Sequence, residues 1–84
     1  MHEGKIAEYS YSIIEEVLKE KYPLMDKKVK KITFAIGRPH TVMRDSFEFY
    51  FCELTRGTFL EGVDLIYEYV EEEGFYVSSI DIED

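Results

Sequence analysis

The sequence has little of what several protein classes require. Its 84 residues include a single cysteine, Cys52, which excludes an internal disulfide framework and a cysteine-rich zinc knuckle. No apolar run approaches the roughly 18 residues of a membrane-spanning helix, and charged residues interrupt residues 1–11, where a secretion signal would lie. We therefore expect a cytoplasmic protein that has no membrane partner.

Glycine and proline are also scarce, with 5 and 2 residues, whereas 45% of the residues are hydrophobic and 15% are aromatic. This composition is too apolar for a disordered chain and is typical of a folded domain. The length suffices for one hydrophobic core but not for two. We predict a single domain over residues 1–84 in which tyrosine and phenylalanine form much of the core, and a homodimer would extend that core.

Basic residues are missing from the C-terminal third of the chain. The formal net charge is -8, and residues 57–84 contain nine acidic residues and no lysine or arginine. Such a segment repels a phosphate backbone, so the sequence disfavours a nucleic-acid partner. The one basic cluster adjoins a predicted strand, where lysines commonly protect a sheet edge. It consists of Lys27, Lys28, Lys30 and Lys31.

The first half of the chain predicts a helix followed by a strand. Residues 3–22 carry apolar side chains at helical spacing, and Pro23 ends this pattern. Residues 29–36 alternate between apolar and other side chains, as in a strand with one buried face, and Gly37 ends the strand. The predicted buried side chains of this strand are Ile32, Phe34 and Ile36.

The second half predicts another helix and two strands. Apolar residues return to helical spacing between Met43 and Leu54, and Gly57 stands where a helix-terminating glycine is expected. Residues 63–70 and 75–82 both alternate, and the tight turn between them predicts an antiparallel hairpin.

These elements predict an α/β two-layer sandwich of order α-β-α-β-β, with two helices packed on one face of a three-stranded mixed sheet. Because only one layer of helix is available, the other sheet face must meet water, a partner or a second copy. If Ile66, Val70 or Val77 is exposed on that face, a partner protein or a second copy is favoured over water.

The candidate metal-binding residues are expected to lie at one end of this sandwich. The first helix and the first strand are similar in length, about 27 Å and 26 Å, so the start of the helix lies level with the end of the strand. Parallel pairing brings the end of the second strand to the same pole. We therefore expect Met1, His2, the loop containing His40 and the run Glu71–Glu73 to lie near one another.

The chain start predicts a metal chelate at that pole. The α-amine of Met1, the deprotonated backbone nitrogen of His2 and its imidazole Nδ1 can bind one ion in a plane. Such nitrogen donors suit Ni(II) or Cu(II), and the backbone nitrogen or carboxylate of Glu3 would complete the square. His40 is a candidate extra ligand, and Glu71–Glu73 are a candidate accessory cation site.

Each of these residues also has a simpler interpretation. A histidine near a chain start is usually solvated, a loop histidine often caps a turn, and three glutamates keep a turn soluble. Cys52 is expected to be a small buried apolar group. No glycine-rich phosphate loop and no nucleophile, histidine and acid arrangement can be identified, so the sequence predicts a binding protein and no catalytic residues.

Several segments resemble the HypA/HybF family of hydrogenase and urease nickel-maturation chaperones. They are Met1-His2-Glu3 at the start of an amphipathic helix, Ile36-Gly37 at the end of a strand, Phe49-Tyr50-Phe51, Leu54-Thr55-Arg56-Gly57-Thr58 and Glu61-Gly62. The resemblance extends over nearly the whole chain. It implies a nickel-binding α/β domain with Met1, His2 and Glu3 as the Ni(II) ligands, and a maturation GTPase or hydrogenase subunit as the partner.

The resemblance is incomplete in one respect. Family members carry a zinc module with two Cys-x-x-Cys pairs between the second and third strands, whereas here Glu71–Gly74 simply turns the chain. The hypothesis is therefore a HypA-like nickel metallochaperone with no zinc site. The alternative is a metal-free interaction module on the same scaffold, which would bind a protein through its open sheet face or its acidic C-terminal half.

Overall fold

The computed structural model describes residues 2–83 and contains the five elements in the predicted order. They are α1 (Glu3–Lys21), β1 (Lys28–Arg38), α2 (Arg44–Thr55), β2 (Asp64–Glu73) and β3 (Phe75–Glu83). Gly57 has a φ of 80°, as expected of the residue that follows a helix. The predicted α/β fold class and element order are confirmed.

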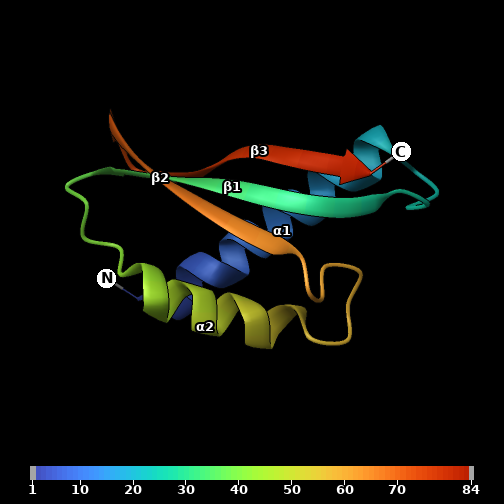
Figure 1. Ribbon diagram of the computed structural model, residues 1–84, viewed down its shortest axis with the longest axis horizontal. Coiled ribbons are helices and arrows are strands. Elements are labelled where there is room, and N and C mark those ends of the chain that lie inside the picture. Colours follow the sequence, from blue (N-terminus) through green and yellow to red (C-terminus); the bar gives the residue numbers. More distant parts are fainter. Residues whose placement is uncertain (1, 84) are drawn as a thin grey trace.

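β1 is the central strand of the sheet, whose order is β2-β1-β3. It pairs in parallel with β2 and antiparallel with β3 (Figure 1). The predicted hairpin between residues 63–70 and 75–82 is therefore wrong, because these strands lie on opposite sides of β1. A turn signal shows that the chain reverses direction, but it does not show which strand the returning segment joins.

The chain crosses over the end of β1 to pass from β2 to β3, and Gly37 permits this crossing. The Gly37 N–H donates to the carbonyl oxygen of Gly74 at 2.7 Å, and the Gly74 N–H donates to that of Arg38 at 3.1 Å. A Cβ at position 37 would overlap the carbonyl oxygens of Glu72 and Gly74. A side chain at this position is therefore incompatible with the observed crossover.

Phe34 lies at the centre of the core and is fully buried. Its ring packs edge-on against Phe47 and Phe51 of α2, with centroids 4.9 and 5.5 Å away. It also stacks on Tyr67 of β2 and Phe75 of β3, with centroids at 5.8 and 5.6 Å. One side chain therefore joins all three strands to α2, in the phase that the alternation in β1 predicts.

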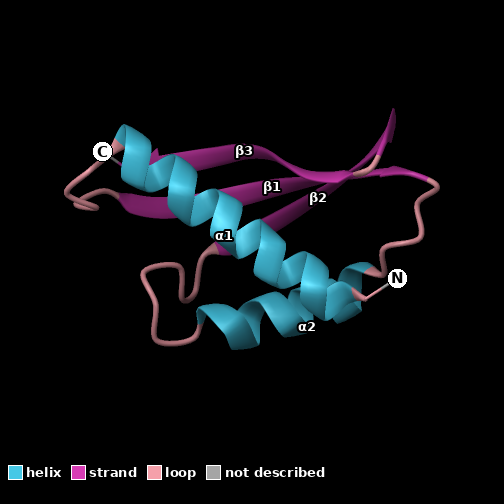
Figure 2. Ribbon diagram, turned by 180° about the vertical axis from the view of Figure 1, so that it is seen from behind, coloured by secondary structure: helices cyan, strands magenta, loops and turns pink. Residues whose placement is uncertain are grey.

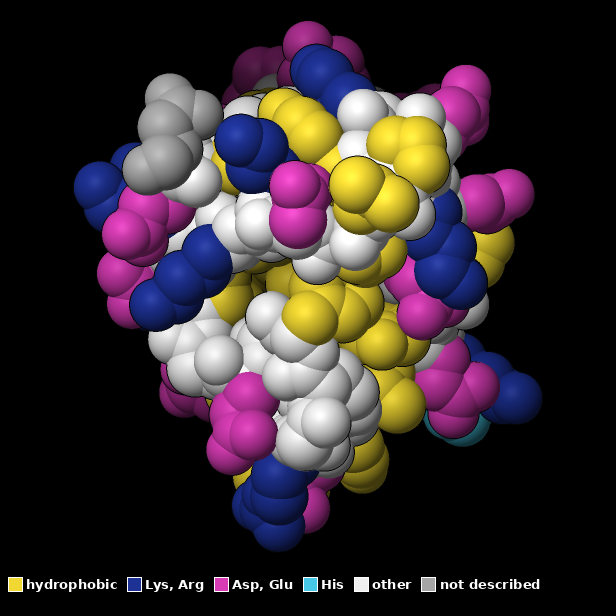
Figure 3. Space-filling model, turned by 90° about the vertical axis from the view of Figure 1, so that its right-hand side faces the viewer, with side chains coloured by type: hydrophobic (Ala, Val, Ile, Leu, Met, Phe, Trp, Pro, Cys, Tyr) yellow, Lys and Arg dark blue, Asp and Glu magenta, His cyan; other side chains and the backbone are white. Residues whose placement is uncertain are grey.

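Both helices lie on the same side of the sheet, and α1 crosses it obliquely (Figure 2). α1 packs mainly against α2 and touches β3 more sparsely. Among residues 2–83, neither helix is long and apolar enough to span a membrane. The opposite end from the chain start exposes apolar side chains at its centre, surrounded by charged ones (Figure 3).

Several side chains differ from their predicted environment. Val77 belongs to the helix-covered face and packs against the core, whereas Ile66 is exposed. Lys31 lies on the central strand and forms an ion pair with Asp81 at 3.2 Å, so it does not protect an edge. Cys52 is exposed on α2 and is not a buried apolar group, because the buried face of this helix consists of Phe47, Phe51 and Thr55.

Candidate metal centre

Three segments that are distant in the sequence meet at the end of the molecule that holds His2. Glu3 of α1 accepts a hydrogen bond through Oε2 from the Met43 N–H, at 3.1 Å. Arg38, at the end of β1, forms an ion pair with Glu71 of β2. The structure therefore confirms that the start of α1, the loop after β1 and the end of β2 share one pole. Met1 lies outside the described residues.

His2 is the N-cap of α1 and has an extended backbone, with φ of -95° and ψ of 95°. Its carbonyl oxygen accepts the first helical hydrogen bond, from the Ile6 N–H at 3.1 Å. Its own N–H takes no part in helix pairing, because the first N–H groups of a helix have no acceptor within it. The imidazole makes no capping hydrogen bond, so the helix uses neither the ring nor the backbone nitrogen.

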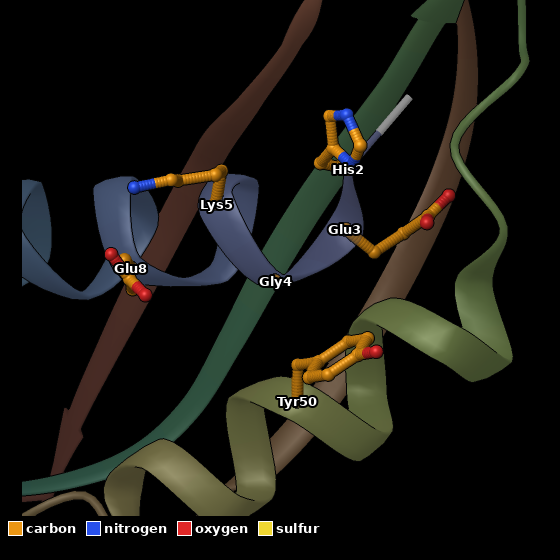
Figure 4. Close-up of a pocket in the computed structure, with 6 residues that line it drawn as sticks. All are labelled: His2, Glu3, Gly4, Lys5, Glu8 and Tyr50. Carbon is orange, nitrogen blue, oxygen red and sulfur yellow. The ribbon is translucent and has the colours of Figure 1, made fainter.

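A surface pocket of about 480 Å³ adjoins His2 (Figure 4). Its lining consists of His2, Glu3, Gly4, Lys5, Glu8 and Tyr50. The Tyr50 ring lies against Gly4, and a Cβ at position 4 would be 3.7 Å from it. The sequence alone did not indicate that Tyr50 lies beside His2. The absent side chain at position 4 was a possible signal, but only the packing of the two helices identifies Tyr50 as the residue that covers it.

The carboxylate of Glu3 points toward the loop that leads into α2, away from the imidazole of His2 (Figure 4). The hydrogen bond from Met43 lowers the pKa of this carboxyl group, and its own backbone N–H adds to the effect. Both interactions favour the charged form. Glu3 therefore joins the first turn of α1 to the start of α2 through its side chain, and its backbone nitrogen remains near His2.

His40 lies on the same pole, in the loop between β1 and α2, and has a φ of 58°. Its Nε2 is 2.8 Å from the carbonyl oxygen of Val70. A carbonyl oxygen can only accept a hydrogen bond, so Nε2 is the donor, and in the neutral imidazole this leaves the lone pair on Nδ1. The ring also packs edge-on against Tyr69, with centroids 5.6 Å apart. His40 is thus oriented by the end of β2.

The described residues do not form a metal cage from side chains alone. Within residues 2–83, no three histidine, cysteine, aspartate or glutamate side chains are grouped so that they could hold a metal ion. His2, Glu3 and His40 therefore share a pole without forming such a group, and the same holds for Glu71–Glu73.

Cys52 does not have the properties of a reactive thiol. Partial desolvation raises its pKa, and the nearby carboxylates of Glu48 and Glu53 raise it further. These effects lower the thiolate fraction at neutral pH, and the thiolate is the nucleophilic and metal-binding form.

Comparison with protein families identifies the family of this chain. Residues 1–75 match the family described as "Hydrogenase/urease nickel incorporation, metallochaperone, hypA". The match extends from Met1-His2-Glu3 to the first residue of β3 and so includes every segment of the pole described above. No curated protein matches the chain. The chain therefore belongs to the HypA family of nickel-incorporation metallochaperones.

Proposed function

We propose that this protein carries Ni(II) at its chain start and delivers it to a nickel enzyme under assembly. The ligands are the amine of Met1, the backbone nitrogen and imidazole Nδ1 of His2, and a supporting donor from Glu3. One observation carries the proposal: the family match begins at Met1-His2-Glu3, where the N-cap position leaves the ring and the backbone nitrogen of His2 unused by the helix.

The position of His2 suits a deprotonated backbone nitrogen. Coordination there removes an amide proton, and no helical hydrogen bond is lost because the N-cap N–H has no partner within the helix. The resulting negative charge lies at the N-terminus of α1, where the aligned peptide dipoles favour an anion. Planar nitrogen donors are well suited to Ni(II) and poorly suited to Mg(II) or Ca(II), which prefer oxygen.

Glu3 has two possible donors, and its contacts favour the backbone nitrogen. Its carboxylate already accepts the Met43 N–H, so binding nickel through the side chain would break that hydrogen bond. Its backbone N–H belongs to the first turn of α1 and lacks a helical acceptor, so its deprotonation gives up only the contact with its own carboxylate. We therefore assign the fourth planar position to the backbone nitrogen of Glu3, while its carboxylate anchors the loop before α2.

His40 is the proposed additional donor. The hydrogen bond to Val70 leaves its Nδ1 available, and metal-binding histidines commonly donate their other ring N–H to a backbone carbonyl. Its ligation requires movement of the loop between β1 and α2, because His40 is not grouped with His2 and Glu3 in the structure. We expect His40 to bind Ni(II) during transfer of the ion to the partner protein.

Transfer proceeds by ligand exchange. An incoming donor from the partner replaces one nitrogen ligand at a time, and protonation of the imidazole in mildly acidic solution favours release. HypA proteins work with hydrogenase maturation partners, and we propose a maturation GTPase or a hydrogenase subunit as the recipient. Two Cys-x-x-Cys pairs cannot be formed from Cys52 alone, so nickel binding by these 84 residues is proposed to need no zinc.

Nickel titration of untagged protein tests the proposal. Calorimetry should show one Ni(II) per chain for the wild type and a large loss of affinity for both His2→Ala and a variant with residues added before Met1. The wild-type complex should also show the yellow absorption of planar Ni(II). Equal affinity in all three proteins would exclude the chelate, whatever the family membership.

A further inference from the structure

An apolar groove of about 330 Å³ lies between the C-terminal half of α1 and β3. It exists because α1 packs mainly against α2 and crosses the sheet obliquely, so β3 is only partly covered (Figure 2). Val17 of α1 is 45% exposed as a result. Apolar side chains form most of both walls: Ile13, Val17 and Leu18 on α1, and Val77, Ile80 and Ile82 on β3.

The polar groups of the groove are few. Ser78 and Ser79 line it on β3, Tyr22 lines it after the end of α1, and Lys21 is the only charged residue of the lining. Small-molecule sites typically have volumes of about 300–1,000 Å³ and a mostly apolar lining, with a few polar groups that orient the ligand. The groove therefore has the composition and size of a small ligand site.

Positive charge lies at one end of the groove, where the C-terminal ends of α1 and β3 come together (Figure 2). Asp81 at this end is already paired with Lys31 at 3.2 Å. Within residues 2–83, neither Lys21 nor Lys30 forms an ion pair. A neighbouring pocket continues the groove past this end and is lined by Tyr22, Lys30, Lys31, Ile80, Asp81 and Ile82.

We propose that the groove binds the anion of a straight-chain carboxylic acid of medium length. The aliphatic chain lies between the two walls, over Val17 and Ile80, and the carboxylate lies at Lys21 with Lys30 beyond it. The charge of the lining favours an anion, although the whole chain carries a net charge of -8. The apolar walls favour an anion that has a hydrocarbon chain over an inorganic one.

The shape of β3 agrees with a small ligand. The wall from Val77 to Ile82 spans about 16 Å at roughly 3.3 Å per residue, which an extended decanoate chain does not exceed. The pairing of β3 with β1 is irregular at two places, between Val29 and Lys31 and between Thr33 and Phe34 of β1. A strand added to such an edge would lack a regular partner, whereas an aliphatic chain needs no backbone hydrogen bonds.

The groove is separate from the proposed nickel ligands. It begins at Ile13 and extends to Tyr22, whereas His2 lies at the other end of α1. The inference goes beyond nickel transport and does not depend on it. It is therefore tested with metal-free protein.

Decanoate is the probe, added to ¹⁵N-labelled full-length protein at concentrations below those at which it forms micelles. We expect saturable changes in amide chemical shift at 13–22 and 77–82. Decyltrimethylammonium has the same chain length and the opposite charge, and it should bind at least about tenfold more weakly. Octanoate should also bind about tenfold more weakly than decanoate, because two fewer methylene groups are buried.

Substitutions test the wall and the charged end separately. Val17→Glu places a carboxylate in the apolar wall and should weaken decanoate binding by about tenfold or more. Lys21→Gln should weaken it by about two- to fivefold, and Lys21→Arg should restore it. Lys27→Gln is the matched control: it removes a lysine from the loop between α1 and β1 that lines neither pocket, so binding should be retained.

Four results would overturn the proposal. Equal binding of decanoate and decyltrimethylammonium would show that the lysines do not select the charge of the ligand. Unchanged affinity of a folded Val17→Glu variant would exclude the groove. Shifts that grow without saturation would indicate non-specific adsorption only. Self-association of the protein without decanoate, abolished by Val17→Glu, would show that a second copy is the occupant. Circular dichroism checks the folding of each variant.

Discussion

The core around Phe34 and the pole around His2 are held by different forces. Phe34 is fully buried and touches aromatic rings from α2, β2 and β3. At the pole, single hydrogen bonds such as Glu3 to Met43 and His40 to Val70 join exposed groups. Large apolar burial stabilises the first region, whereas the second contributes little to stability and keeps nitrogen donors accessible. Stability and metal binding should therefore respond to different substitutions.

Phe34→Ala should have the largest effect on stability. It removes the ring that joins three strands to α2, and burial losses of this kind cost about 3–5 kcal/mol. Urea unfolding followed by circular dichroism measures the change. Tyr9→Ala is the control, since Tyr9 is 70% exposed and its loss should change the free energy of unfolding by less than about 0.5 kcal/mol. Similar losses in both variants would contradict the assigned core.

Gly37→Ala should destabilise the protein by about 2–4 kcal/mol. The new methyl group would overlap the carbonyl oxygens of Glu72 and Gly74, so the crossover from β2 to β3 has to shift. Urea unfolding measures the loss, and amide exchange should show that it starts at residues 72–75. A variant as stable as the wild type would mean that the chain does not cross over β1 at this point.

His2→Ala should separate binding from stability. We expect at least about a hundredfold weaker Ni(II) binding, because an anchoring ring donor is lost. The melting temperature of the metal-free protein should stay within about 1 °C of the wild type, since His2 is exposed and makes no capping hydrogen bond. His40→Ala should weaken binding less, by about tenfold at most. A large fall in stability with His2→Ala would show that the pole and the core are coupled.

Glu3→Gln should remove a small pH dependence of stability in the metal-free protein. The pKa of Glu3 is lowered from 4.5 in the folded state, so its contribution is present above the unfolded pKa and is lost as the pH falls through the folded pKa. The glutamine oxygen can still accept the Met43 N–H but does not titrate in this range. Melting temperatures below about pH 5 should therefore fall more steeply for the wild type than for Glu3→Gln.

Gly4→Ala should have the smallest effect, and it should be stabilising. A Cβ at position 4 would meet the Tyr50 ring at 3.7 Å, which is ordinary contact, and alanine is favoured over glycine within a helix. The expected gain is about 0.5–1 kcal/mol in the free energy of unfolding, with unchanged nickel affinity. Destabilisation would indicate that Tyr50 packs more tightly over the first turn than the structure shows.

Local patterns in the sequence predicted the elements well. The alternation of Ile32, Phe34 and Ile36 identified the buried face of β1, and Pro23 and Gly57 marked the ends of the two helices correctly. The pairing of the last strand was predicted wrongly, because the turn at Gly74 is compatible both with a hairpin and with a crossover. The choice depends on which strand edge offers better packing, and residues in the turn do not encode that information.

At the pole, too, the sequence predicted which segments meet but not the contacts between them. Its composition could be predicted from the lengths of the elements and from parallel pairing, which placed the start of α1, the His40 loop and the end of β2 together. The contacts within it could not be predicted. The hydrogen bond from Met43 to Glu3 and the position of Tyr50 beside Gly4 both depend on how α1 lies against α2, and residues about 40 positions apart show no common periodicity.

The sequence by itself determined the type and order of the elements, the phase of the central strand and the donors available at the chain start. These are local properties, since they follow from backbone preference, side-chain periodicity and chemical type. Only the tertiary structure decided that β3 joins β1, that Glu3 holds the start of α2 and that one edge of the sheet stays open beside a groove. These outcomes arise from competition among distant surfaces for burial and hydrogen bonds, which no short stretch of sequence can settle.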